Sequence, residues 1–193
     1  MTAQWVAAKM MGRWRDGTPL IDRPIEAGPG TPAGAVPDND FTYGADDPTG
    51  LACPLGAHIR RANPRDTLQP GDPTEQAITN RHRLLRRGRT YDVPGTDEAP
   101  GEKGLLFVCL AGDIERQFEF VQQTWVGSPA FSGLVDEPDP VVTQSDAEGP
   151  RGFTIPTTSG PVTLCMQSFV TVRGGGYFFL PSRSALEYLS ELN

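Results

Sequence analysis

One of the two histidines in this chain of 193 residues, His58, lies in the stretch LACPLGAHIRRANPRD. A histidine that activates a serine or cysteine nucleophile needs that residue in a familiar motif, and a histidine that holds zinc needs further ligands. The sequence offers neither pattern. No Gly-x-Ser-x-Gly motif occurs, and the five-residue spacing from Cys53 to His58 matches no thiol-protease or metal pattern. Because no cysteine pair has Cys-x-x-Cys spacing, the sequence does not predict a zinc site. A lone histidine of this kind is more often structural than a ligand.

Many arginines follow this histidine in the sequence. The window from His58 to Arg89 holds eight arginines and three acidic residues, a net charge of +5, whereas the whole chain carries −7. Such a cluster is usually a solvated basic face. The strong preference for arginine over lysine favours a second interpretation, because a planar guanidinium binds carboxylates or phosphates through two parallel hydrogen bonds. An anionic ligand near His58 is therefore a reasonable hypothesis.

Haem satisfies both features at once. A porphyrin supplies four ligands to its iron, so one histidine suffices as the axial ligand. Its two propionates also require cationic partners, and an apolar wall would cover its ring. A lone histidine beside an arginine cluster is consistent with such a site, although the structural interpretation stays open at this point.

The composition limits the class of protein. The length fits a single domain over residues 1–193, and the 22 glycines and 19 prolines predict many loops. No apolar run is long enough for a membrane span, and the N-terminus does not resemble a signal peptide. Three widely spaced cysteines indicate reduced thiols and a cytoplasmic location. The acidic chain has few lysines, which argues against nucleic-acid binding.

The pattern of residues predicts an α+β fold with a mainly antiparallel sheet. A short helix is expected at 5–11, ended by Gly12, followed by a long irregular loop at about 16–50. The later elements are expected to be a strand at 82–91, a buried strand at 104–112, an amphipathic helix at 113–126 and a loop at 127–152. Residues 167–181 are expected to form two short strands or one strand interrupted by a bulge, and residues 182–192 a helix capped by Ser182 or Ser184.

Several of these motifs, in this order, resemble the dye-decolourising (DyP-type) haem peroxidases. CPLGAHIRRANPRD is similar to the segment that carries their proximal histidine, and NRHRLLRRGRTY to their distal arginine strand. GLLFVCLAGDIERQFEFVQQTW and FVTVRGGGYFFLPS resemble the strand–helix unit and the closing segment. The resemblance implies a ferredoxin-like domain with helices on one face of the sheet. It also implies haem b as cofactor, with hydrogen peroxide and a small-molecule reductant such as a dye or phenol as substrates.

The resemblance also implies roles for individual residues. His58 would ligate the iron through Nε2, and Arg86 would be the distal arginine that stabilises the anion formed when the peroxide bond breaks. Arg87 would face the other way on the same strand. Asp113 is expected either to accept a hydrogen bond from His58 Nδ1, with Glu119 as the second candidate, or to serve only as a helix N-cap.

The remaining candidates would surround the haem. At least one of three arginines is expected to pair with a propionate, namely Arg60, Arg61 or Arg65. The apolar wall is expected to come from one or two residues of the predicted strand, Leu106, Phe107 or Val108. Two aromatic residues, Tyr177 and Trp125, could relay a radical, although aromatic residues in apolar segments usually belong to the core.

One part of the family pattern has no counterpart. The Gly-x-x-Asp-Gly motif, whose aspartate acts beside the distal arginine, does not occur, and the chain resembles the C-terminal half of the family alone. Three hypotheses follow: a peroxidase whose N-terminal half is supplied by a separate chain or was lost, a haem-binding module without turnover, and an inactive fragment. The long loop at 16–50 is expected to be ordered only against the other half.

Overall fold

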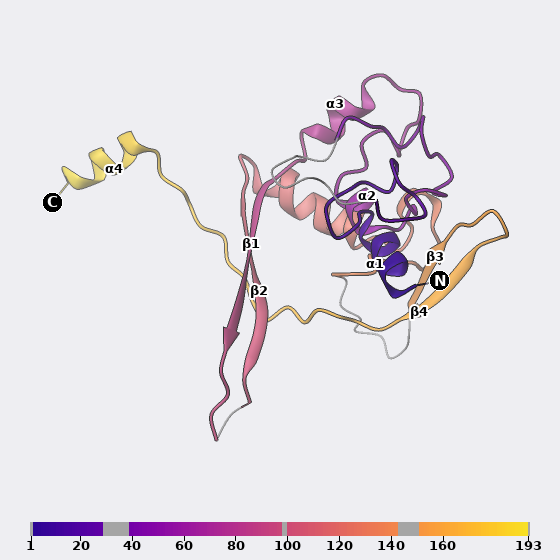
Figure 1. Cartoon of the computed structure of the whole chain (residues 1–193). Helices are drawn as coiled ribbons and strands as arrows, with labels where there is room; N and C mark the ends of the chain where they lie inside the picture. Colours follow the sequence, from indigo (N-terminus) through magenta and orange to yellow (C-terminus); the bar gives the residue numbers. More distant parts are fainter. Residues whose placement is uncertain (1, 29–38, 98–99, 143–150, 193) are drawn as a thin grey trace.

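The computed structural model describes residues 2–28, 39–97, 100–142 and 151–192 (Figure 1). It confirms an α+β fold with antiparallel strands. Its elements are α1 (Ala3–Met11), α2 (His58–Ala62), α3 (Glu75–Asn80), β1 (Leu85–Val93), β2 (Glu102–Leu110), η1 (Glu115–Glu119), η2 (Val121–Val126), η3 (Phe131–Gly133), β3 (Arg151–Ile155), β4 (Val162–Met166) and α4 (Arg183–Ser190). No helix among these residues has the length and apolar character needed to cross a membrane.

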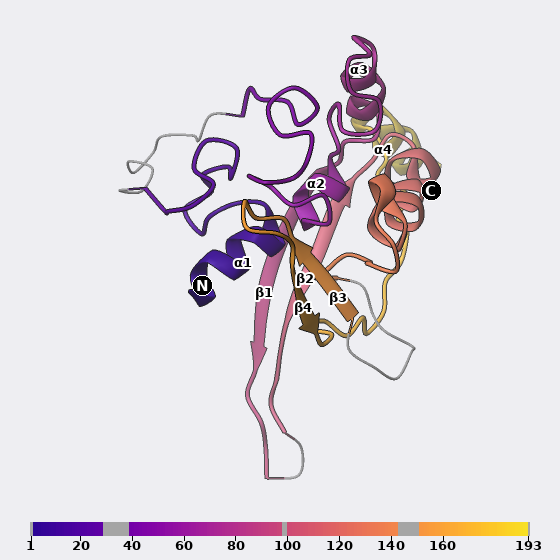
Figure 2. The ribbon, with the colours of Figure 1, turned by 90° about the vertical axis from the view of Figure 1, so that its right-hand side faces the viewer.

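The N-terminal part forms a compact lobe around α1 and α2 (Figure 2). As predicted, α1 ends at Gly12, whose φ of +89° closes the helix with a left-handed residue. The core of this lobe is an apolar cluster that the irregular segments help to build: Ala8, Trp14, Leu20, Tyr43, Cys53 and Ala57. The described parts of the 16–50 loop therefore pack within this chain, contrary to the expectation that another half must order them. Residues 29–38 of that loop lie outside the described residues.

A long hairpin, β1–β2, extends away from this lobe (Figure 1). The two strands pair antiparallel over nine residues each, with Leu85 opposite Leu110 and Val93 opposite Glu102. Both strands were expected from the sequence, but the prediction that the second would be buried is wrong. Most of its side chains are exposed, because within the described residues the sheet has no third strand.

A helical segment follows β2 directly, as the apolar spacing predicts. Asp113 Oδ1 accepts the backbone N–H of Arg116 at 3.0 Å, which is the contact of a helix N-cap. Much of the segment has π-helical hydrogen bonding, in which a backbone N–H donates to the carbonyl five residues earlier, as from Gly127 to Gln122 at 2.8 Å. The inner face of this segment is formed by three buried residues, Val121, Trp125 and Val126.

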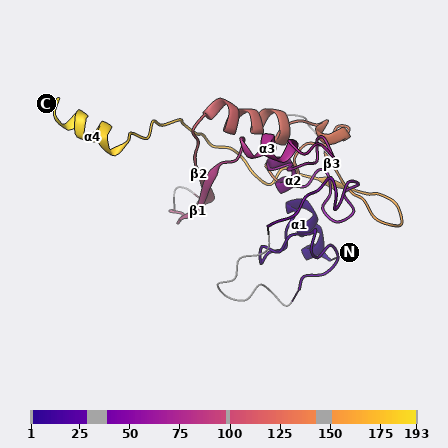
Figure 3. The same ribbon diagram turned by 90° about the horizontal axis from the view of Figure 1, so that it is seen from above.

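The C-terminal region differs from the prediction. The expected strands within 167–181 are absent from the described residues there, and the second hairpin is formed earlier, by β3 and β4. Residues 167–182 instead form an extended arm that leads to α4, which stands apart from the other helices in two views (Figures 1 and 3). Helix α4 is predicted correctly, and its N-cap is Ser182, whose Oγ accepts the N–H of Ala185 at 3.2 Å.

Candidate functional site

His58 begins helix α2, and its ring is held by a buried carboxylate. The Nδ1 atom lies 2.8 Å from Oδ2 of Asp139, whose side chain is fully buried, while the side chain of His58 is 27% exposed. Within the described residues, Nε2 has no hydrogen-bond partner. Because the bond to Asp139 places the Nδ1 proton toward the carboxylate, the lone pair of Nε2 is left available to a ligand or a metal.

The expected carboxylate partner of His58 was therefore wrong. Asp113 caps the helical segment and pairs with Arg116 at 3.6 Å, so the alternative interpretation as an N-cap is the one that the structure supports. Glu119 accepts the hydroxyl proton of Tyr177 at 2.9 Å. The true partner, Asp139, is 81 residues from His58 and lies in an irregular segment rich in acidic residues and proline, where no local pattern distinguishes it.

Asp139 is stabilised in its ionised form. Burial by itself would raise the pKa of this carboxyl group, but the hydrogen bond and the charge of His58 and the backbone N–H groups of Val142 and Val141 act in the opposite direction. The pKa therefore lies below its ordinary value. The two backbone groups donate to Oδ1 at 3.0 and 2.9 Å, which leaves Oδ2 to His58.

Arg61 fixes the segment that carries Asp139. Its fully buried guanidinium donates from Nη1 to the carbonyl oxygens of Trp125 at 3.1 Å and Ser128 at 2.7 Å, and from Nη2 to the carbonyl oxygen of Glu137. One side chain of α2 thus binds both ends of the turn between η2 and Asp139. Because His58 lies one helical turn before Arg61, the arginine sets the position of the carboxylate relative to the histidine.

The glycine that precedes Ala57 and His58 is required by close packing. A Cβ atom at Gly56 would lie 2.8 Å from Oε1 of Glu137 and about as close as ordinary contact allows to Phe153. The same Oε1 accepts the N–H of Thr154 at 2.8 Å. Strand β3 is therefore joined to Glu137, whose carboxylate lies against Gly56, and a larger residue at position 56 would displace this carboxylate.

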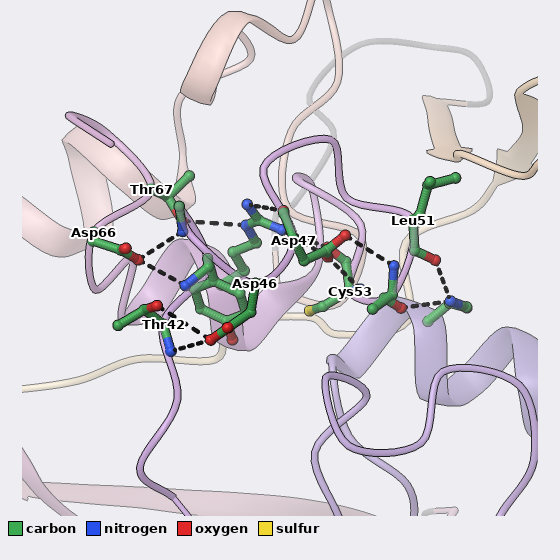
Figure 4. A network of polar contacts seen from close by, with 12 residues as sticks. Thr42, Asp46, Asp47, Leu51, Cys53, Asp66 and Thr67 are labelled. Atoms are coloured by element: carbon green, nitrogen blue, oxygen red, sulfur yellow. Dashed lines mark hydrogen bonds and ion pairs between the residues drawn. The ribbon is translucent and has the colours of Figure 1, made fainter. Parts of the chain in front are cut away.

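The other two arginines of the motif are structural as well. Arg60 donates from Nη1 to Asp47 at 3.1 Å and to the carbonyl oxygen of Cys53 at 2.7 Å, and from Nε to Thr67 at 3.2 Å. Figure 4 shows these three acceptor residues within one network of polar contacts. Arg65 donates to the carbonyl oxygens of Asn39 and Phe41 at 3.0 and 2.7 Å.

The expectation that Arg60, Arg61 or Arg65 pairs with a propionate is thus not supported. All three are buried, and their guanidinium groups are already bound to carbonyl oxygens and side chains of this chain. A buried cation must be paired or hydrogen-bonded, and these loops satisfy that requirement. Several other arginines have no such partners within the described residues, and five of these are exposed ones in or just before β1: Arg81, Arg83, Arg86, Arg87 and Arg89.

The register of the hairpin separates Arg86 from Arg87. Arg86 lies opposite Cys109, and Gly88 lies opposite Phe107, so these positions share one face of the sheet. Phe107 stacks against Phe118 with ring centroids 6.3 Å apart, which places this face on the side of the helical segment.

The opposite face holds Arg87, Arg89, Leu106 and Val108. Phe107 is thus the candidate wall residue that shares a face with Arg86. No hydrogen bond or ion pair between described residues joins either face to His58, whereas Asp139 contacts the histidine directly.

Sequence reasoning assigned no role to the second histidine. His82 stacks on Phe120 with centroids 4.7 Å apart and contacts the edge of Trp125, while its Nδ1 lies 2.7 Å from the carbonyl oxygen of Arg116. Trp125 belongs to the core, as aromatic residues usually do, whereas Tyr177 is exposed on the C-terminal arm.

Comparisons with known proteins agree with this fold. No family model matches the chain. The chain is 35% identical to the multifunctional dye peroxidase DyP2 of Amycolatopsis, with 94% of this chain and 40% of that protein covered. A dye-decolorizing peroxidase of Auricularia auricula-judae is 31% identical, over 95% of this chain and 39% of its own length. Among solved structures, a variant of the Pleurotus ostreatus dye-decolorizing peroxidase has a TM-score of 0.76 at 32% identity, covering 95% of this chain and 43% of that one.

The chain belongs to the DyP-type peroxidase family and matches the C-terminal part of its members. It spans about two fifths of the length of the curated relatives that it matches. The fold class expected from the resemblance is confirmed by these structural neighbours.

Proposed function

We propose that this chain forms the proximal side of a haem b site, with His58 as the axial ligand, and serves as part of a hydrogen-peroxide-dependent peroxidase. The observation that carries the proposal is the 2.8 Å contact between His58 Nδ1 and the buried carboxylate of Asp139. Metal-bound histidines typically donate their second ring N–H to a carboxylate or carbonyl, which fixes the ring and makes the ligand more basic. The names of the relatives support the peroxidase activity.

The residues around His58 can supply an axial ligand to haem, but they do not supply cations for its propionates. The partly exposed ring offers Nε2 outward, and a single histidine is enough for a porphyrin iron. The arginines that follow it are bound within the fold, so propionates would need cations elsewhere. Two exposed arginines between α3 and β1, Arg81 and Arg83, have no ion pair among the described residues and are our candidates for that role.

Haem, when bound, would supply the iron at which peroxide is reduced and single electrons are taken from a dye or phenol. The role of this chain's residues follows from their charges. Asp139 would hold the Nδ1 proton of His58 and so increase electron density on Nε2. Arg86 would stabilise negative charge on the departing oxygen, because its guanidinium stays cationic and cannot act as the proton-transferring base.

The proposal also requires a proton-transferring group that Arg86 cannot replace. Proton transfer between the two peroxide oxygens requires a group that gains and loses a proton, and Arg86 cannot provide it. We infer that such a group belongs to the part of the peroxidase that has no counterpart in this chain, which spans only two fifths of its relatives. The alternative is a haem-binding module without turnover, which the exposure of the Arg86 face favours when the chain is alone.

Titration with haemin tests the proposal. The wild-type chain should give a sharp Soret band, and His58→Gln should remove it, because the substitution deletes the only proposed axial donor. Asp139→Asn should keep the band but weaken haemin binding by roughly 10–100-fold, as loss of an outer-shell partner typically does.

His82→Gln is the matched control, since it alters the other histidine and should leave the Soret band and the affinity unchanged. The proposal is wrong if His58→Gln retains the wild-type spectrum. It is also wrong if His82→Gln, rather than His58→Gln, removes the band.

A further inference from the structure

We propose that Glu137 is a second acidic residue of the His58 site, whose buried carboxylate offsets the charge of Arg61 so that the charge of Asp139 acts on the histidine. The inference rests on the proposed function, which it deepens by naming a further residue that tunes the ligand. Arg61 fixes where the carboxylate of Asp139 lies, and Glu137 determines how strongly that carboxylate attracts the Nδ1 proton.

The carboxylate of Glu137 lies against the backbone that leads into α2. The residue is 5% exposed, and its Oε1 accepts the N–H of Thr154 at 2.8 Å. A Cβ atom at Gly56, two residues before His58, would lie 2.8 Å from the same oxygen and 3.5 Å from the fully buried Phe153. Charges interact more strongly in such an apolar, buried environment than in water.

Arg61 is a buried cation without an ion pair among the described residues. Its guanidinium donates from Nε to the carbonyl oxygen of Gly56 at 3.1 Å, and from its two terminal nitrogens to the carbonyl oxygens of Trp125, Ser128 and Glu137. Carbonyl oxygens satisfy the N–H groups of a guanidinium but carry no net charge. The positive charge in the interior must therefore be offset by carboxylates that do not bind it directly.

Two carboxylates provide that offset. Burial lowers the pKa of Arg61, and the charges of Asp139 and Glu137 both oppose this effect. One buried cation and two buried anions leave a net charge of −1 beside a neutral His58. If Asp139 alone faced Arg61, the two charges would cancel, and the histidine would lie next to a neutral pair. Glu137 therefore supplies the surplus negative charge that strengthens the hydrogen bond at Nδ1.

This surplus charge would matter to the iron of a bound haem. A porphyrin ring with two negative charges leaves ferric iron with a net charge of +1 and ferrous iron with none. A buried net charge of −1 beside His58 favours the ferric state and makes Nε2 more electron-rich, since charge and burial around an axial ligand set the reduction potential. Loss of the Glu137 charge should shift the balance toward the ferrous state.

Two complementary substitutions separate the charge of Glu137 from its contacts. Glu137→Gln removes the charge but keeps an oxygen that can accept the N–H of Thr154, whereas Glu137→Asp keeps the charge on a side chain that is one methylene group shorter. Asp136→Asn is the matched control, because it removes the same charge from the neighbouring, exposed residue. Asparagine also tolerates the left-handed backbone at this position, where φ is +53°.

The first measurement needs no haem. Proton NMR of the chain at a fixed pH follows the Nδ1–H of His58, which is identified by its loss in His58→Gln. Glu137→Gln should move this signal upfield, because Asp139 becomes a weaker acceptor for the proton. Glu137→Asp and Asp136→Asn should both leave the signal near its wild-type position.

The second measurement is the ferric–ferrous midpoint potential of the chain loaded with haemin. Glu137→Gln should raise the ratio of ferrous to ferric iron by about tenfold at a given potential, which corresponds to a midpoint about 59 mV more positive for a one-electron couple. Asp136→Asn should change the midpoint far less, because water and salt screen an exposed charge.

The inference is overturned if Glu137→Gln leaves the NMR signal in place, or if Glu137→Asp moves it as far as Glu137→Gln does. A Glu137→Gln chain that does not fold also overturns it, since the residue would then serve the architecture. A signal that moves as expected in a chain without a His58-dependent Soret band would remove the haem assignment but keep the role of Glu137. A normal Soret band with an unmoved NMR signal would remove the role of Glu137 alone.

Discussion

At the scale of residues, the central finding concerns three buried arginines, of which at least one was expected to contact a ligand: all three instead bind groups of this chain and stabilise its fold. Arg61 is the clearest case, because its guanidinium binds three carbonyl oxygens around the turn that leads to Asp139. Burial lowers the pKa of Arg61, while the charges of Asp139 and Glu137 oppose that effect. The arginine is therefore a positioning residue for the His58–Asp139 pair.

Arg61→Lys should destabilise the chain by about 2–4 kcal/mol, because an ammonium group cannot reach all of these carbonyl oxygens and leaves some of them unpaired. Denaturant unfolding measures the effect. Arg116→Lys, at an exposed position of the helical segment, is the control and should change stability by less than about 0.5 kcal/mol. A loss for Arg61→Lys no larger than that of the control would contradict its positioning role.

A second prediction concerns the buried thiol of Cys53. Burial raises its pKa from an ordinary value near 9 to about 12. The folded chain therefore keeps this proton after the unfolded chain has lost it, so the stability contributed by the neutral thiol is complete below pH 9 and declines as the pH rises toward 12. Cys53→Ala should reduce the slope of unfolding free energy against pH between pH 9 and 11.

Tyr43 leaves part of that slope in place, because burial raises its pKa as well. Cys165→Ala, an exposed thiol on β4, controls for the removal of a cysteine as such. Identical pH profiles for the wild type and Cys53→Ala, measured by chemical unfolding, would refute the assignment.

At the scale of elements, the sequence predicted those parts whose signals are local. The glycine after α1, the apolar spacing of residues 113–126 and the serine before α4 each identify an element through neighbours a few residues apart. The β3–β4 hairpin was not anticipated, and the 167–181 segment was expected to pair but does not. Strand pairing depends on distant partners, which the local pattern does not contain.

The same distinction explains the candidate site. His58 could be selected from its motif, but its partner Asp139 lies 81 residues away in a turn held by Arg61. Arginine frequency alone indicated an anionic ligand, whereas the anionic and carbonyl partners of Arg60, Arg61 and Arg65 are all within the fold. Only contacts in three dimensions separate those two interpretations.

The packing of α1 against α2 gives a prediction at this scale. Gly12 has a φ of +89°, and a Cβ atom there would lie 2.4 Å from Cγ2 of Ile59 in α2. Gly12→Ala should therefore cost well over about 1 kcal/mol, the sum of a strained backbone and a displaced helix. Gly71→Ala is the matched control, since its φ is +90° but nothing lies within 4 Å of the added atom. Equal losses in thermal unfolding would show that the contact with Ile59 contributes nothing.

At the scale of the whole molecule, the chain divides into a well-packed lobe and an exposed remainder. The packed part, which consists of the N-terminal lobe and the segment around Asp139, holds His58 and the buried arginines, while the hairpin and the C-terminal arm expose apolar residues such as Phe178, at 89%. The proximal part of the proposed site is therefore packed within this chain, whereas the hairpin face that carries Arg86 is exposed. Ligand binding and turnover should separate experimentally for the same reason.

The exposed hairpin also has a consequence in the cell. A pair of strands with exposed apolar side chains and unpaired edges tends to aggregate, and it is readily recognised by chaperones and proteases. Copies whose hairpin stays exposed should therefore be degraded rather than stored.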